Sequence, residues 1–131
     1  PAGHTVYAAE WLRAAGGSDA LVRAVQSHNS DNNPDLPAPE LPMEKVLFAV
    51  DELTGLIGAA VIMRPSKSVM DLEVKSLKKK FKDKRFAAGC SRETIQQGAE
   101  LLDWELSELL ERTLQAMKAT EADIEAQCAA L

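Results

Sequence analysis

Residues 106–117, LSELLERTLQAM, carry the strongest hydrophobic period in this chain of 131 residues. Leu106, Leu109, Leu110, Leu114 and Met117 recur at i, i+3, i+4, i+8 and i+11, so they share one face of an α-helix. Elsewhere the β-branched residues never alternate with polar residues over a long run, and aromatic residues make up only 5% of the chain. The sequence therefore predicts an all-α fold, a compact bundle of about five to six helices.

Two helices are predicted in the first 28 residues. The first covers residues 3–15 and ends at Gly16-Gly17. The second begins after the capping residue Ser18 and carries His28 on its apolar face. The candidate core residues of the two helices are Val6, Trp11, Leu12, Leu21, Val22 and Val25. His28 is therefore expected to point towards the core.

A long loop separates these helices from the third. Residues 29–42 hold four prolines, three asparagines and two aspartates, a composition that excludes regular structure. The third helix is predicted from about Met43 to Met63, where Pro65 ends it. Its expected apolar face consists of Val46, Val50, Leu53, Ile57 and Val61. A second stripe, Asp51, Gly55 and Gly58, would let another backbone approach Asp51.

Serine residues suggest where the remaining helices begin. Ser66 or Ser68 can cap a helix that runs through a lysine-rich segment to about Ala88, and Ser91 can cap the next one.

At this length one domain, residues 1–131, can bury roughly two thirds of its unfolded surface. A core of that size needs no disulfide or metal to hold it together.

The cysteines and charges restrict the class of protein. Cys90 and Cys128 lack the spacing of a metal site, which predicts free thiols in a reducing, cytoplasmic compartment. The longest apolar run, residues 56–63, is too short to span a bilayer, and no leader pattern opens the chain. Net charges of −4, +5 and −6 fall on residues 1–66, 67–85 and 86–131. This imbalance argues against a general nucleic-acid binder, and no membrane partner is expected.

Three residues have the chemistry of metal ligands: His4, His28 and Asp51. Two imidazoles and a carboxylate suit a divalent transition metal, which lowers the pKa of a bound water. A lone histidine on an apolar face is, however, more often a hydrogen-bonded core residue. Composition and hydrophobic periodicity alone favour hydrogen-bonded core histidines over metal ligands. No serine or cysteine has a histidine at a spacing that would make a catalytic nucleophile, so no catalytic residue is assigned.

Three segments resemble the HD superfamily of metal-dependent phosphohydrolases. The segment GHTVYAAEWLRAAGGSDALVRAVQSHN, residues 3–29, is similar to the part of an HD domain that follows its His-Asp motif. The segment AVDELTG, residues 49–55, resembles the helix of the closing aspartate. The segments RPSKS, 64–68, and VKSLKKKFKDK, 74–84, resemble the C-terminal extension of a bacterial subgroup of predicted HD hydrolases. Residues 1–65 would then be a truncated HD domain and residues 66–131 its helical extension.

The resemblance implies a metal site and also shows what it lacks. Asp51 matches the closing aspartate, and His4 and His28 match two auxiliary histidines of a family that holds iron, manganese, nickel or magnesium. The adjacent His-Asp pair of the family has no counterpart, since no HD dipeptide occurs in the sequence. With at most three ligands, we expect weak metal binding and little phosphohydrolase activity.

Arg64, Lys67 and Lys75 are the candidates for holding a phosphate of a small phosphorylated ligand. Lys67 and Lys75 lie in the most recognisable segments, and Lys75 shares a helical face with Lys78, Lys79 and Lys82. The structural alternative is a solvated helix face whose lysine stems cover apolar surface.

Two functions follow from these observations. One is a helical interaction domain without phosphohydrolase activity; the other is an active metal-dependent phosphohydrolase acting on a phosphomonoester or nucleotide, with His4, His28 and Asp51 as ligands. If the leading helices of the family are absent, an apolar surface around Asp51 needs a cover. A homodimer or higher homo-oligomer that packs first or third helices together would supply it.

Overall fold

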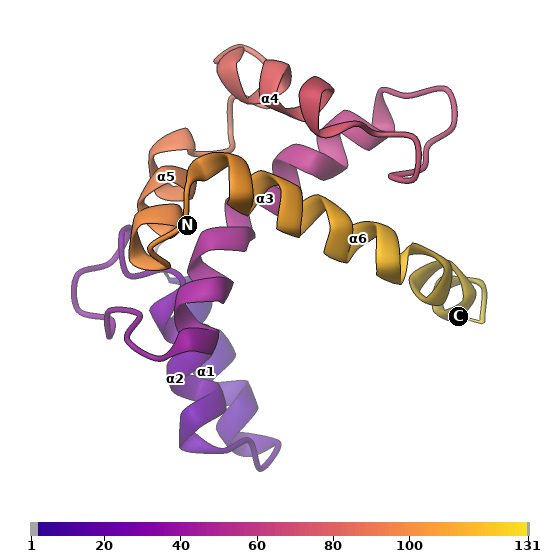
Figure 1. Cartoon of the computed structure of the whole chain (residues 1–131). Helices are drawn as coiled ribbons and strands as arrows, with labels where there is room; N and C mark the ends of the chain where they lie inside the picture. The colour runs from indigo at the N-terminus through magenta and orange to yellow at the C-terminus, as the bar shows by residue number, and fades with distance from the viewer. Residues whose placement is uncertain (1–2, 131) are drawn as a thin grey trace.

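The computed structural model describes residues 3–130, and within them it contains six α-helices and no strand, which confirms the all-α prediction (Figure 1). The helices are α1 (His4–Ala14), α2 (Asp19–Ser27), α3 (Pro42–Ile62), α4 (Val74–Lys82), α5 (Arg92–Leu101) and α6 (Leu106–Ala129). The longest two, α3 and α6, each cross much of the molecule.

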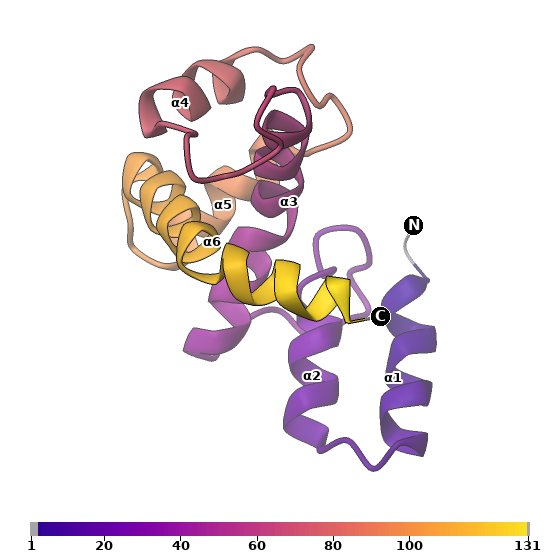
Figure 2. The ribbon, with the colours of Figure 1, turned by 90° about the vertical axis from the view of Figure 1, so that its right-hand side faces the viewer.

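The other helices are arranged around α3. Helices α2, α4, α5 and α6 pack on it directly, whereas α1 packs on α2. Figures 1 and 2 both place α1 and α2 at one end of α3 and α4 at the other. The core lies where α3, α5 and α6 meet, and its fully buried large side chains include Leu53, Leu56, Ile57, Ile95, Leu109 and Leu114.

The predicted apolar face of α6 is confirmed. Leu109, Leu110 and Leu114 are buried, and Leu106 and Met117 pack partly buried against the same cluster. The face predicted for α3 is confirmed in part. Leu53 and Ile57 are buried, and Val50 and Val61 pack partly buried against the core, whereas Val46 is 40% exposed. The buried face is wider than predicted, since it also includes Phe48, Ala49, Leu56 and Ala60.

A glycine does bring two backbones close together, but on α5 rather than on α3. A Cβ added to Gly98 would lie 2.4 Å from the Cα of Ala49, so α5 sits directly against α3. A Cβ added to Gly58 would meet nothing within 4 Å, and one on Gly55 would meet only the Cys90 sulfur. The prediction that the Gly55 and Gly58 stripe admits another backbone was wrong.

The predicted fourth helix was too long at both ends. Its cap is Glu73 rather than Ser66 or Ser68, and α4 ends at Lys82 because Asp83 turns to an extended conformation. The guanidinium of Arg92 then organises residues 83–90 by donating to six backbone carbonyls, those of Lys80, Phe81, Asp83, Phe86, Ala87 and Cys90. One side chain therefore ties the start of α5 to the end of α4.

The long loop of residues 29–41 is held at three points. The hydroxyl of Thr94 on α5 donates to Asp31 at 2.7 Å, and Arg23 on α2 donates to the carbonyl of Ala38. The fully buried carboxylate of Glu44 accepts from the backbone N–H groups of Glu40 and Leu41 and pairs with Arg23 at 2.9 Å. These contacts link α2, the loop and the first turn of α3.

The predicted core face of α1 was wrong. Val6, Tyr7 and Trp11 are 40%, 64% and 76% exposed, and the residues that α1 buries are Thr5 and Ala9. Small side chains on the inner face suffice because α1 has only α2 to pack against. In Figure 2, α1 stands at the outer edge of the molecule with its far side uncovered by any other helix.

Candidate functional site

The hairpin of α1 and α2 brings the two histidines together. His4 is the first residue of α1 and His28 is the C-cap of α2. The turn at residues 15–18, with Gly16 at φ +82°, reverses the chain and brings His28 next to His4. Their Nε2 atoms lie 3.2 Å apart and their ring centroids 5.4 Å apart. His4 is exposed and His28 half-buried. Residues separated by 24 positions thus form one imidazole pair.

The two Nε2 atoms lie at hydrogen-bond distance, so one imidazole can donate its N–H to the other, and the same spacing is compatible with two ligands of one metal ion. Metal–imidazole bonds of about 2.0–2.1 Å in a tetrahedral site place neighbouring nitrogens about 3.3–3.4 Å apart, close to the separation found here. The surroundings are less complete. The Nδ1 atom of His28 is buried and has no hydrogen-bond partner in residues 3–130, whereas a ligating histidine usually donates through its second nitrogen. The pair can hold a metal but does not have its outer support.

Asp51 does not join the histidine pair. Its side chain is exposed on α3 rather than directed inwards, and among the described residues no group of three or more His, Cys, Asp and Glu side chains could hold a metal. Asp51 instead lies on the side of α3 that faces Cys90. Burial raises the pKa of the Cys90 thiol, and the negative charges of Glu52 and Asp51 raise it further, while Arg92 opposes them.

Arg64 and Lys67 have structural partners at the end of α3. Arg64 donates to the Asp71 carboxylate at 2.7 Å and to the Asp71 carbonyl, and hydrogen bonding to this guanidinium lowers the pKa of Asp71. The Lys67 ammonium donates to the carbonyl of Ile62 in the last turn of α3. Glu121 on α6 accepts from the Ser68 hydroxyl and the Val69 N–H. The RPSKS segment therefore terminates α3 and fastens it to α6.

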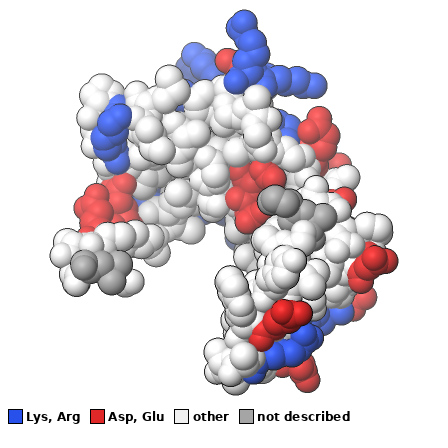
Figure 3. All heavy atoms as spheres, turned by 180° about the vertical axis from the view of Figure 1, so that it is seen from behind, with Lys and Arg blue, Asp and Glu red and all other residues white. Residues whose placement is uncertain are grey.

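Lys75 belongs to a different surface. It lies exposed on α4 with Lys78, Lys79 and Lys82, and the basic side chains gather at that end of the molecule in Figure 3. The histidine pair belongs to the hairpin of α1 and α2, which Figures 1 and 2 place towards the end of α3 away from α4. Lys75 and the histidine pair therefore lie on separate surfaces of the chain.

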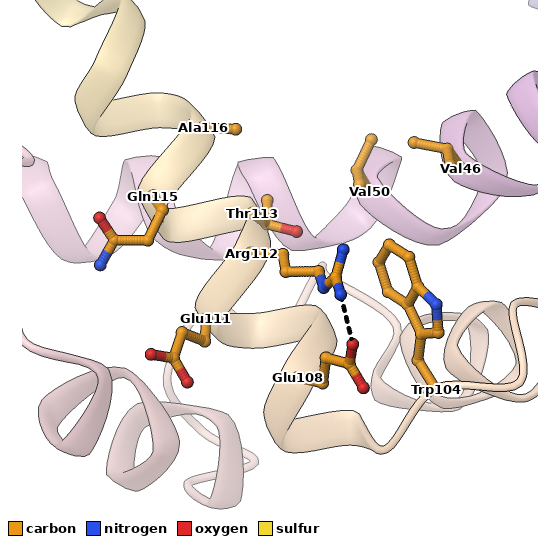
Figure 4. A pocket seen from close by; sticks show the side chains of 9 residues that line it. All are labelled: Val46, Val50, Trp104, Glu108, Glu111, Arg112, Thr113, Gln115 and Ala116. Atoms are coloured by element: carbon orange, nitrogen blue, oxygen red, sulfur yellow. Dashed lines mark ion pairs between the residues drawn. The ribbon is translucent and has the colours of Figure 1, made fainter.

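A groove of about 650 Å³ lies between α3 and α6 (Figure 4). Val46 and Val50 form one wall, and the Arg112 guanidinium covers the Trp104 ring at 4.5 Å while pairing with Glu108 at 2.8 Å. The Trp104 ring also packs partly buried against the core cluster. The Glu108-Arg112 spacing of four residues is the sequence signal for this pair. One face of the Arg112 guanidinium lies over Trp104 and one of its NH2 groups pairs with Glu108, while Glu111 is a further charged residue in the lining.

Comparison with known proteins found no matching family model, no similar curated protein and no similar solved structure. Among the helices of the described residues, none combines the length and the apolar character that crossing a bilayer requires.

Proposed function

We propose that this chain is an HD-superfamily hydrolase-like helical domain that acts by self-association, with little or no phosphohydrolase activity of its own. The observation that carries the proposal is the exposed aromatic face of α1, formed by Tyr7 and Trp11. Aromatic side chains supply large contact areas and are enriched at protein interfaces. Two of the six Phe, Trp and Tyr residues in this chain stand exposed on one helix, one turn apart.

A second copy is the simplest occupant of this face. An isologous contact through α1 would place Tyr7 and Trp11 of each chain against the same residues of the other, so each substitution counts twice. The free thiols Cys90 and Cys128 agree with a cytoplasmic location for such a protein.

The available ligands support low activity. His4 and His28 supply two ligands, whereas a catalytic metal site usually has three protein ligands and an open position. The family resemblance assigns the missing ligands to a His-Asp pair that this sequence does not contain. A metal held by two imidazoles alone would bind weakly, because water would compete with the imidazoles for its coordination positions.

A second candidate is an active metal-dependent phosphohydrolase, and the 3.2 Å spacing of the imidazole pair favours it. His4 and His28 would hold the metal, whose chemistry is to supply hydroxide near neutral pH. Imidazole nitrogens suit iron, manganese or nickel better than magnesium, which prefers oxygen ligands. Asp51 would have to reach the pair from an exposed position on α3.

Sedimentation velocity on matched variants tests the proposal. The Tyr7→Ser/Trp11→Ser variant removes the α1 face, and Ile62→Ser/Met63→Ser removes two side chains that are 67% and 70% exposed at the other end of α3. Since truncating one aromatic anchor of an interface costs about 2 kcal/mol or more, the first variant should weaken self-association by at least about 10-fold. The control should associate like the wild type.

Two results would contradict the proposal. The first is equal association of both variants and the wild type. The second is clear, metal-dependent turnover of a generic phosphomonoester by the purified chain with iron, manganese or nickel, which would favour the hydrolase instead.

A further inference from the structure

The imidazole pair and the exposed aromatic residues share one stripe of α1. His4, Tyr7 and Trp11 are spaced at i, i+3 and i+7, which places them on the same side of the helix. A contact that two copies make through this stripe includes His4 of both copies. With a two-fold axis that passes beside His4, the His4–His28 pair of one copy faces that of the other.

We propose that two copies of this chain form one metal site, in which His4 and His28 of each copy supply four imidazole ligands to a single divalent zinc-like cation. This inference rests on the self-association through α1 proposed above. The metal would lie on the two-fold axis and would be a structural clamp with a complete ligand set.

The spacing of the pair is compatible with tetrahedral coordination. At zinc–nitrogen distances of about 2.0–2.1 Å, neighbouring ligands are separated by about 3.3–3.4 Å in a tetrahedron and by about 2.8–3.0 Å in an octahedron. The observed Nε2–Nε2 distance of 3.2 Å is closer to the tetrahedral value. Each chain therefore presents one edge of a tetrahedron, and a second copy supplies the opposite edge.

The described residues of one chain offer two ligands to this site. His4 and His28 are the only histidines in the sequence, and no third His, Cys, Asp or Glu joins them within residues 3–130. Four nitrogen ligands suit zinc, whose structural sites are closed tetrahedra. Because the dimer binds the metal better than the monomer does, the metal must also favour the dimer.

Sedimentation equilibrium of the full chain with and without Zn²⁺, combined with native mass spectrometry and the absorption spectrum of Co²⁺, tests the inference. We expect one metal per two chains, a tetrahedral cobalt spectrum, and a dimer dissociation constant at least about 10-fold lower with Zn²⁺ than in chelator. The His4→Ala and His28→Ala variants should each lose this metal response. The Asp51→Asn variant is the matched control and should respond like the wild type.

The outcomes separate the two proposals. One metal per chain without a change in mass, or loss of the response in Asp51→Asn, would overturn the shared four-histidine site. A dimer that forms equally with metal and with chelator would overturn that site while leaving self-association intact. A monomer under every condition would overturn both.

Discussion

Replacing Gly98 by alanine tests the closest contact between two helices of the fold. The added Cβ would lie 2.4 Å from the Cα and 2.6 Å from the Cβ of Ala49 on α3. Carbon atoms in contact are separated by about 3.5–4.0 Å, so α5 must move away from α3 by roughly 1 Å. Overpacking of this kind costs about 1–3 kcal/mol, and we expect the upper end because the obstacle is backbone.

Alanine also has a helix propensity about 1 kcal/mol better than glycine, which offsets part of that cost. The expected net loss is about 2 kcal/mol in the free energy of unfolding, measured by urea denaturation followed by circular dichroism. Gly58→Ala is the control, since its Cβ meets nothing within 4 Å and it should gain up to about 1 kcal/mol. If Gly98→Ala were as stable as Gly58→Ala, the close packing of α5 on α3 would be wrong.

Three further predictions concern single side chains. Arg92→Met should lower the free energy of unfolding by about 2 kcal/mol or more, because the backbone carbonyls that Arg92 binds lose their donor. Proteolytic cleavage within residues 83–90 should increase, and unchanged cleavage would contradict this role of Arg92. Burial raises the pKa of Glu44, but the N–H groups of residues 40 and 41 and the charge of Arg23 outweigh it, so the net pKa is lowered. The stability that Glu44 contributes is therefore fully present above its unfolded pKa of about 4.3, and it is lost as pH falls through the lower folded pKa. Glu44→Gln should make the free energy of unfolding less dependent on pH in this acid range. An unchanged pH dependence would refute this role of Glu44. A thiol reagent near neutral pH should modify exposed Cys128 about 10-fold faster or more than Cys90, whose pKa is raised; equal rates in the single Cys→Ser variants would count against it.

Helix periodicity predicted those parts of the fold where one face has one clear partner. The leucines of α6 are buried as their spacing indicated, because the core lies on a single side of that part of the helix. On α3 the buried face is wider than predicted and includes Phe48 and Ala49, since Gly98 allows α5 to pack directly on Ala49. Nothing near α3 in the sequence signals that contact, which joins residues 49 positions apart.

The same limit explains the error on α1. Spacing shows which residues share a face, but it does not show whether another helix covers that face. The spacing of Trp11 is therefore equally compatible with a core and with an interface residue, and only the position of α1 at the edge of the molecule separates the two. The six carbonyl contacts of Arg92 were likewise missed, because they depend on the path of the backbone and not on residue type.

The candidate site was predicted in part. The sequence singled out His4 and His28, and the hairpin of α1 and α2 places their Nε2 atoms 3.2 Å apart. The third expected ligand, Asp51, is exposed on α3 and does not enter a group of metal-binding size with them. Arg64 and Lys67, which looked like phosphate ligands, make hydrogen bonds that close the end of α3.

Sedimentation equilibrium of the wild-type chain in chelator, over a wide range of concentrations, measures its self-association without metal. We expect a weight-average mass that rises with concentration from the 14.2 kDa of one chain towards twice that value. A mass that stays at 14.2 kDa at every concentration would contradict it.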